Sequence, residues 1–260
     1  MPEGVEIEIY RRQALAVVGR TIESVTADDD WFLKGDASAD EIAASSVGAS
    51  VDEVRRRGKL LMLDLSSGHL LGLRFGMTGR LVVDDHSAID YLEYSSQRNE
   101  PAWDRFGLTF SDGSTLTIRD PRRLGGVELN PDETALGPDV FTVTLAELKA
   151  RVFVGQVAIK ARLLDQRRLA GVGNLIADET LWRAGIDPAR PADSLDGNDQ
   201  RRLHRHLRAV VDEFLANGGS HTGRLQDFRV RGGQCPKCGA KLDRRTVGGR
   251  TTYSCPRHQR

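Results

Sequence analysis

The sequence predicts an α+β protein with an N-terminal helix, a β-sandwich, a helical region and a short metal-stapled C-terminal segment. Three observations support this prediction. Short β-like runs separated by turn residues occupy much of the first half of the chain, as in sandwich folds. From residue 144 the apolar positions follow a helical period instead. All three cysteines lie between positions 235 and 255, where they favour a metal site over a disulfide framework.

The N-terminal part is expected to pack one helix on the β-sandwich. Apolar positions within residues 3–18 line one helical face, and Gly19 ends the run. Turn sequences such as Ser66-Ser67-Gly68 separate the strands that follow. The expected strands span residues 21–26, 51–56, 60–65, 69–75, 79–83, 106–110 and 115–118. Residues 84–104 are polar and irregular, so we expect a loop there.

Helices dominate the remainder of the chain. Thr144 is a predicted N-cap. The expected helices span residues 144–152, 157–168, 175–184 and 197–216. We expect domains at residues 1–135, 136–220 and 221–260. The last domain is too short and polar for a core of its own, so it needs a staple.

The net charge of zero hides a strong asymmetry along the chain. Residues 1–150 carry 16 Lys and Arg against 26 Asp and Glu, a net charge of −10, whereas residues 201–260 carry 14 against 4, a net charge of +10. Chance clustering on a solvated surface is one explanation. The explanation we favour is that the C-terminal part faces a polyanion. With no apolar run of membrane-span length and no signal-like N-terminus, we expect a cytoplasmic protein.

The cysteines belong to two pairs of metal-ligand spacing. Cys235 and Cys238 are separated by two residues, and the same spacing separates Cys255 from His258. Thiolate and imidazole donors in this pattern predict one tetrahedral Zn²⁺ ion. Because the protein fills all four positions, the expected role is structural. Three unrelated free thiols would not explain why every cysteine clusters here.

The first three residues form a second candidate site. If Met1 is removed, Pro2 presents a secondary amine at the chain terminus. An α-amino group titrates near pH ~8, so much of it is neutral and nucleophilic at physiological pH. Its condensation with an aldehyde-level carbon gives an iminium ion, and Glu3 is placed to donate or accept a proton. A Met-Pro start is common, so this interpretation depends on the rest of the chain.

A glycine-rich turn, Gly171-Val172-Gly173-Asn174, separates two of the expected helices. Such a turn brings bare backbone N–H groups against an anion at a helix N-terminus. Asn174 is expected to act both as a helix cap and as a phosphate donor.

Taken together, these segments resemble the formamidopyrimidine-DNA glycosylase/endonuclease VIII family over nearly the whole chain. The matching motifs occur in the family's order. They are Met1-Pro2-Glu3-Gly4, Arg57-Gly58-Lys59, Gly76-Met77-Thr78-Gly79, Asp120-Pro121-Arg122-Arg123, Leu164-Asp165-Gln166, Ala170-Gly171-Val172-Gly173-Asn174, Ala177-Asp178-Glu179 and the C-terminal metal ligands. The resemblance implies an N-terminal helix plus β-sandwich, a helix–two-turns–helix domain and a zinc finger.

The same resemblance implies a bifunctional DNA glycosylase and AP lyase of base excision repair. Its partner would be double-stranded DNA that contains a damaged, oxidised base or an abasic site, bound by a monomer. Pro2 would attack C1′ of a flipped nucleotide, with Glu3 assisting sugar-ring opening. Strand cleavage by β-elimination would follow, with Lys59 as proton donor and Arg250 aiding a second, δ-elimination.

The remaining implied roles concern DNA contact. Lys160 and Asn174 match residues that hold phosphates. Met77, Arg122 and Leu124 match the wedge that fills the gap left by the flipped base. For Met77, a core position at a strand end is the competing interpretation.

Several positions depart from the family pattern and bear on the lesion. Val5 replaces a proline, His258 replaces a fourth cysteine, and Leu124 replaces an aromatic wedge. The short stretch 222–231 lacks a lesion-capping loop, which argues against a dedicated 8-oxoguanine enzyme. It favours oxidised pyrimidines, ring-opened or hydantoin lesions, or a different lesion altogether. Both subfamilies stay open, because Gly4 matches the endonuclease VIII side and other motifs match the formamidopyrimidine side.

Two alternatives remain. One is a non-catalytic relative that binds damaged or abasic DNA without cleaving it. The other is a zinc-ribbon RNA-binding protein, which would leave Met1-Pro2-Glu3 unexplained.

Overall fold

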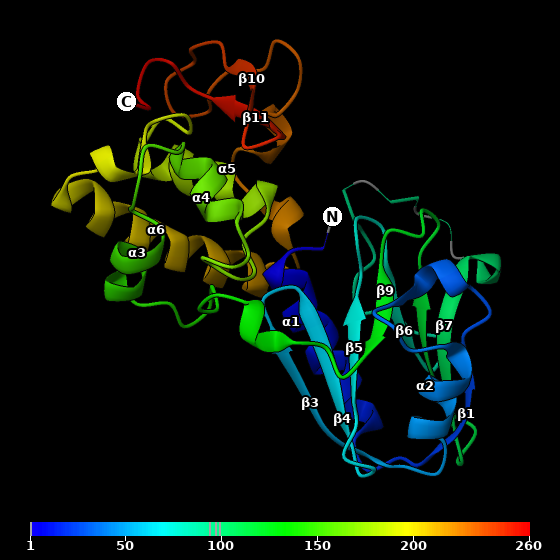
Figure 1. Ribbon diagram of the computed structural model, residues 1–260. Helices are drawn as coiled ribbons and strands as arrows, with labels where there is room; N and C mark the ends of the chain where they lie inside the picture. Colours follow the sequence, from blue (N-terminus) through cyan, green and yellow to red (C-terminus); the bar gives the residue numbers. More distant parts are fainter. Residues whose placement is uncertain (1, 94, 97, 99) are drawn as a thin grey trace. The chain divides into compact units, whose positions relative to one another are not determined.

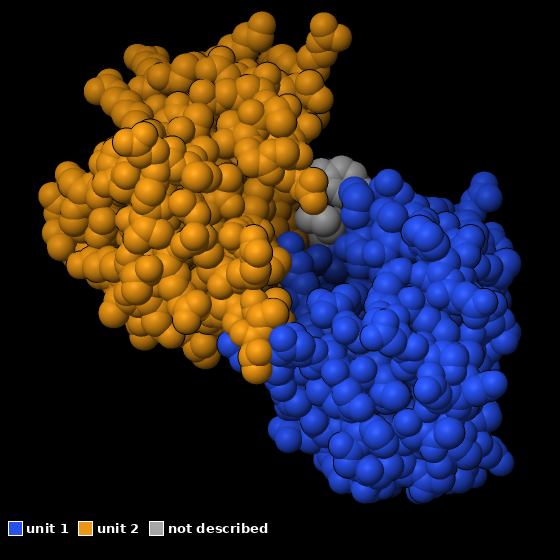
Figure 2. All heavy atoms as spheres, viewed as in Figure 1, with its two compact units in different colours: residues 1–2, 6–133 blue, residues 3–5, 134–260 orange. Residues whose placement is uncertain are grey.

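The computed structural model describes residues 2–93, 95–96, 98 and 100–260 (Figure 1). The chain forms two compact units (Figure 2). Unit 1 contains residues 1–2 and 6–133, and unit 2 contains residues 3–5 and 134–260. Met1 and three positions of the expected loop 84–104 lie outside the described residues. None of the described helices is both long and apolar enough to cross a membrane.

Unit 1 is built on two β-sheets. The first has the order β1 (Ile22–Thr26), β7 (Asp104–Phe110), β8 (Thr115–Arg119), β6 (Arg80–Val83). The second has the order β2 (Leu33–Lys34), β9 (Gly126–Leu129), β5 (Leu70–Arg74), β4 (Leu60–Leu65), β3 (Val51–Arg57). All neighbouring pairs are antiparallel except β2 and β9.

Helix α1 (Gly4–Ala14) contributes to the core of unit 1 together with both sheets. Its buried residues Ile7, Tyr10 and Ala14 recur at helical spacing, so one face of the helix is apolar. Tyr10 packs against Phe75 with ring centroids 4.7 Å apart, and its hydroxyl donates to the carbonyl of Gly79. The expected combination of an N-terminal helix and a β-sandwich is confirmed.

Several elements of unit 1 were not predicted, and the short strand β2 is one of them. Helix α2 (Ala39–Ser46) buries only Ile42 and Ser46, so it leaves little apolar period in the sequence, although a capping box joins Ser38 and Glu41. Strand β9 begins at a Gly-Gly pair that resembles a turn. A Cβ on Gly126 would lie 2.5 Å from the Lys34 side chain, so the glycine permits close packing between strands.

Unit 2 is helical up to its C-terminal hairpin (Figure 1). Its helices are α3 (Leu145–Arg151), α4 (Ile159–Leu164), α5 (Asn174–Ala184) and α6 (Gly197–Ala216), and its hairpin pairs β10 (Asp243–Val247) with β11 (Arg250–Ser254). Thr144 caps α3 as expected, through a capping box with Glu147. Helix α4 is shorter than the predicted span 157–168. Helix α5 is buried almost throughout its length, so it forms the centre of unit 2.

Candidate active site and nucleic-acid interface

The carboxylate of Glu3 is fully buried at the N-terminus of α5. Its Oε2 accepts hydrogen bonds from the backbone N–H groups of Gly173 and Ile176, both at 3.0 Å, and its Oε1 accepts from Leu175 at 2.8 Å. Such N–H groups lack partners within a helix, and the helix dipole favours negative charge beside them. The anion that the glycine-rich turn holds in this structure is therefore the protein's own third residue.

Gly173 is the residue that admits this carboxylate. A Cβ at Gly173 would lie 2.2 Å from Cδ of Glu3, so no other residue fits without displacing the acid. The expectation that Asn174 caps α5 is wrong, because Gly173 occupies the N-cap position. The Nδ2 atom of Asn174 instead donates to the carbonyl oxygen of Thr251 at 3.1 Å.

Pro2 is buried and immediately precedes the anchored Glu3. The residue after Glu3 is also held, because the Gly4 N–H donates a 2.8 Å hydrogen bond to the Gly171 carbonyl. Lys59 belongs to unit 1, where it is half-buried in the two-residue turn between β3 and β4. Its neighbour Gly58 adopts a φ of 59°, as such a turn requires.

A separate candidate region, within unit 1, is a pair of loops that one carboxylate joins. Asp120 is fully buried and accepts hydrogen bonds from the Thr78 hydroxyl at 2.5 Å and from the backbone N–H groups of Leu124 and Gly125 at 2.9 and 2.8 Å. The packing between the loops is tight, since a Cβ on Gly76 would lie 2.4 Å from the backbone of Leu124. Asp120 therefore fixes the loop 76–79 against the loop 120–125.

These loops carry the three expected wedge residues. Leu124 is 48% exposed and Arg122 is exposed, whereas Met77 is half-buried. Arg123, between Arg122 and Leu124, has a φ of 55° and donates from Nε and Nη2 to the two carboxylate oxygens of Asp29. This hydrogen-bonded ion pair holds the pKa of Asp29 below its usual value. Arg123 thus anchors the loop, while its neighbours Arg122 and Leu124 are exposed to solvent.

The predicted metal ligands come together in unit 2. One ligand atom each from Cys235, Cys238, Cys255 and His258 lies within 4.8 Å of the others. The Sγ atoms of Cys238 and Cys255 are 3.4 Å apart, and Nδ1 of His258 lies 3.7 and 3.8 Å from two sulfurs. Tetrahedral zinc with ~2.3 Å bonds places its sulfur ligands about 3.8 Å apart, so the donor set fits that ion.

Helix α5 also contributes to the surroundings of this cluster. The indole Nε1 of Trp182 donates to Sγ of Cys235 at 3.3 Å, and the Trp182 ring lies edge-on to the His258 imidazole. Hydrogen bonds to a sulfur ligand orient it and stabilise its thiolate form. No sequence pattern identified Trp182, because the indole belongs to an element 53 residues away from Cys235.

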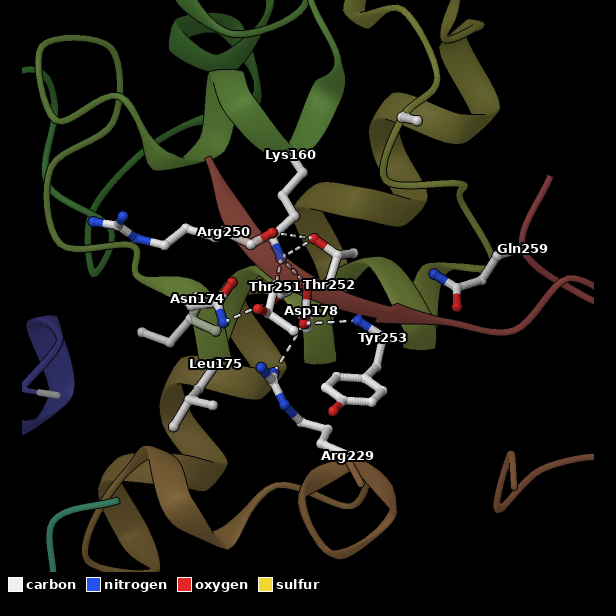
Figure 3. Close-up of polar contacts among 12 residues, drawn as sticks. Lys160, Asn174, Leu175, Asp178, Arg229, Arg250, Thr251, Thr252, Tyr253 and Gln259 are labelled. Carbon is white, nitrogen blue, oxygen red and sulfur yellow. Dashed lines mark hydrogen bonds and ion pairs between the residues drawn. The ribbon is translucent and has the colours of Figure 1, made fainter. Parts of the chain in front are cut away.

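Lys160, Asn174 and Arg250 all lie around the start of β11 (Figure 3). Arg250 is exposed, as expected of a residue that meets a phosphate. The Lys160 side chain is fully buried, and its ammonium pairs with Asp178 at 2.6 Å. Burial lowers the pKa of Lys160, and the ion pair with Asp178 opposes that effect. The structure thus places Lys160 beneath the hairpin, in contact with protein groups.

The sandwich, the helices joined by a glycine-rich turn and the hairpin with three cysteines and a histidine together define a helix–two-turns–helix protein with a zinc-finger type of C-terminus. A family model described as the formamidopyrimidine-DNA glycosylase N-terminal domain matches residues 1–127, and one described as the formamidopyrimidine-DNA glycosylase H2TH domain matches residues 135–225.

Whole-chain comparisons agree with these matches. Formamidopyrimidine-DNA glycosylase of Geobacillus kaustophilus is 34% identical, with full coverage of both chains, and that of Thermus thermophilus is 35% identical over 98% of this chain and 97% of the relative. A crystal structure of the LlFpg protein with THF-DNA and an inhibitor superposes with a TM-score of 0.83 at 25% identity, with full coverage of both chains. The chain therefore belongs to the formamidopyrimidine-DNA glycosylase family. Enzymes of this family are DNA glycosylases of base excision repair with AP lyase activity, and this chain is one of them.

Proposed function

We propose that this enzyme removes an oxidised base from double-stranded DNA through a Schiff base on Pro2 and then cleaves the strand at the resulting abasic site. The observation that carries the proposal is the anchoring of Glu3 by three backbone N–H groups. A terminal residue is ordinarily mobile, and this anchor fixes the residue next to the nucleophile. Removal of Met1 frees the Pro2 nitrogen.

In the proposed reaction, the Pro2 nitrogen attacks C1′ of the flipped nucleotide and the bond from C1′ to the base breaks. Glu3 accepts the proton that the Pro2 nitrogen releases after its attack and transfers it to the sugar-ring oxygen, so that the ring opens and the nitrogen forms an iminium ion with C1′. Because the iminium withdraws electrons, a proton leaves C2′ and the C3′–O bond breaks in β-elimination. Lys59 supplies a proton in this step, and Arg250 assists δ-elimination at the 5′ side.

The charge of Glu3 supports the same chemistry. Backbone donors stabilise an ionised carboxylate, and an anion one residue from Pro2 favours the cation that forms there. Glu3 would thereby have two functions, transferring a proton and stabilising the iminium ion.

We infer that the two loops joined by Asp120 hold the DNA after base flipping. Leu124 and Met77 would fill the gap in the stack, and Arg122 would hydrogen-bond the orphaned partner base. Asn174 and Arg250 would bind phosphates beside the lesion, with Lys160 supporting them. The helical part 136–220 and the finger 221–260 would form the DNA-binding regions.

The cluster of three cysteines and His258 would hold one structural Zn²⁺ ion. Bound zinc would tie the two ends of the finger together, and it would take no part in the proton transfers. Oxidised pyrimidines and ring-opened or hydantoin bases are the expected lesions, since residues 222–231 leave no room in the sequence for a long capping loop. We infer that the enzyme works in the cytoplasm, associated with the nucleoid if the cell is bacterial.

Borohydride trapping on a duplex with one abasic site tests the proposal. Reduction of the iminium should leave a stable adduct whose mass and peptide map place it on Pro2. Confirming the loss of Met1 by mass spectrometry is the necessary control. An intact, DNA-binding protein that lacks Met1 and gives no adduct would contradict the Schiff-base mechanism and favour a non-catalytic binder.

A further inference from the structure

The start of β11 is joined to helices α4 and α5 by a continuous chain of hydrogen bonds (Figure 3). The ammonium of Lys160 donates to Oγ1 of Thr252 at 2.7 Å. The Thr252 hydroxyl in turn donates to the backbone carbonyl of Arg250 at 3.0 Å. A hydroxyl has one proton to donate and lone pairs that accept, so Thr252 serves both bonds at once. The backbone position of Arg250 is thereby tied to a buried cation.

The neighbouring carbonyl is held from the same side. Thr251 O accepts the hydrogen bond from Asn174 Nδ2 at 3.1 Å, and Lys160 Nζ lies 3.5 Å from it. Asn174 and Arg250, which we propose to bind phosphates directly, lie on different elements. Their relative position is therefore set by contacts at residues 251 and 252.

An ionic cluster lies beneath these contacts. Asp178 is fully buried, and its two carboxylate oxygens pair with Lys160 at 2.6 Å and with Arg229 at 2.9 Å. The buried Glu3 carboxylate also acts electrostatically on Lys160, so two cations and two carboxylates balance in this part of unit 2. Arg229 also lies over the Tyr253 ring, 5.6 Å from its centroid, and is itself 7% exposed.

Buried charges need compensation, and these cations and carboxylates compensate one another, so the cluster is a fixed support under the hairpin. The hairpin tip also approaches α4 closely, since a Cβ on Gly248 would lie 3.0 Å from Ala161. The hairpin tip and the first residues of β11 thus contact helices α4 and α5 at several separate points.

We propose that Thr252 and Arg229 are positioning residues for phosphate binding. Thr252 transmits the position of the Lys160–Asp178–Arg229 cluster to Arg250, so that Arg250 and Asn174 meet the same stretch of DNA backbone. This inference rests on the proposed function and adds two residues that no family motif in the sequence marked. Lys160 then acts through Thr252.

The test measures coupling between Thr252 and Arg250 in the full-length, zinc-loaded protein. Affinity for a duplex with one tetrahydrofuran abasic analogue is measured by fluorescence anisotropy for the wild type, Thr252→Val, Arg250→Gln and the double variant. Valine has the shape of threonine without the hydroxyl. We expect Thr252→Val to weaken binding about tenfold, and Arg250→Gln to cost much less in the valine background than in the wild type, since residues that act through one another are non-additive.

Matched variants separate positioning from simple destabilisation. Thr252→Ser keeps the hydroxyl and should restore binding. Arg229→Met should weaken binding as Thr252→Val does, and Arg229→Lys should recover part of it. Arg20→Met removes an ion pair of unit 1, that with Asp84, away from the proposed DNA contacts, and should leave affinity within about twofold.

Full additivity of Thr252→Val and Arg250→Gln, or wild-type binding by folded Thr252→Val, would overturn the inference. Melting temperatures and zinc content show whether each variant is folded. Trapping of the wild type on abasic DNA is run in parallel. If the wild type is trapped on abasic DNA but the effects of Thr252→Val and Arg250→Gln on affinity are additive, the inference is refuted and the proposed chemistry stands. A wild type that fails to trap refutes the proposed chemistry, and the coupling still decides the inference.

Discussion

The carboxylate of Glu3 and the backbone N–H of Leu175 are joined by a 2.8 Å hydrogen bond across 172 positions of the sequence. Gly173 and Ile176 donate to the same carboxylate, so one side chain satisfies the N-terminus of α5. The residue beside Pro2 is therefore at once a structural anchor and a candidate for chemistry. Substitutions can separate these two contributions.

Glu3→Gln should lose both the negative charge and one of the two acceptor oxygens. We expect the free energy of unfolding to fall by about 1–3 kcal/mol, because backbone donors are left unsatisfied. Excision of a damaged base should fall more than cleavage at a pre-formed abasic site, since ring opening needs the proton transfer. Chemical denaturation and parallel rates on the two substrates measure this. Equal losses on both substrates would argue against proton transfer by Glu3.

Gly173→Ala tests the anchor without altering Pro2 or Glu3. A methyl group 2.2 Å from Cδ of Glu3 must displace the carboxylate. We expect loss of stability and of excision comparable to Glu3→Gln. Gly197→Ala is the matched control, because Gly197 is exposed and begins α6 with only the Arg201 side chain near its added Cβ. A Gly173→Ala enzyme with wild-type rates would show that the anchor is dispensable.

Asp120→Asn should loosen both wedge loops. An amide offers one acceptor oxygen in place of two, so its NH₂ group would face either the N–H groups of Leu124 and Gly125 or the N–H group of Arg122. We expect excision from duplex DNA to fall at least tenfold, consistent with the cost of buried unsatisfied donors. Cleavage of a single-stranded abasic substrate, which needs no flipping, should fall less.

Variants of Thr78 should loosen the wedge loops by a smaller amount, because Thr78 contributes one hydrogen bond to Asp120. Thr78→Val should fall between the wild type and Asp120→Asn in duplex excision, and Thr78→Ser should match the wild type. Fluorescence of 2-aminopurine placed next to the lesion reports base flipping directly. Wild-type flipping by Asp120→Asn would exclude this role.

The contacts that the sequence predicted are local ones. The capping box of Thr144 with Glu147 spans three residues, and each metal-ligand pair has a two-residue spacer. Spacing of this kind fixes geometry within one turn of backbone. The fold class could be predicted because hydrophobic periodicity and turn residues are also local signals.

The contacts between residues far apart in the sequence could not be predicted in this way. The Thr78 hydroxyl and Asp120 are 42 positions apart, and Asp178 meets the backbone of Tyr253 across 75. Lys160 matches a phosphate-holding residue of the family. The sequence did not reveal that β11, over 90 positions away, encloses its side chain. Burial and partner choice depend on tertiary packing, which neither propensity nor spacing encodes.

Leu124→Ala should reduce excision with little effect on stability. At 48% exposure the side chain contributes little to the core, so the free energy of unfolding should change by no more than about 0.5 kcal/mol. The wedge offsets the few kcal/mol that unstacking the flipped base requires, so its loss should make excision slower. Leu15→Ala is a matched control, since Leu15 is 47% exposed in the same unit. Equal rates for the two variants would exclude a wedge role for Leu124.

Cys238→Ser should release the metal and unfold the finger. Elemental analysis should find one zinc ion per wild-type chain and none in the variant, because a structural site needs all four ligands. DNA affinity should fall together with its salt dependence, since Arg250 would no longer be held near phosphate. Unchanged affinity in a zinc-free protein would contradict the structural role.

His258 gives the sharper version of that test, because its Nδ1 faces two of the sulfurs. His258→Cys keeps a ligand of the correct softness and should retain zinc, with affinity for DNA near that of the wild type. His258→Ala leaves three ligands and should lose zinc to a mild chelator much faster. If His258→Ala held zinc as tightly as the wild type, the fourth ligand would have to be another group. The finger would then be closed by a contact other than the imidazole.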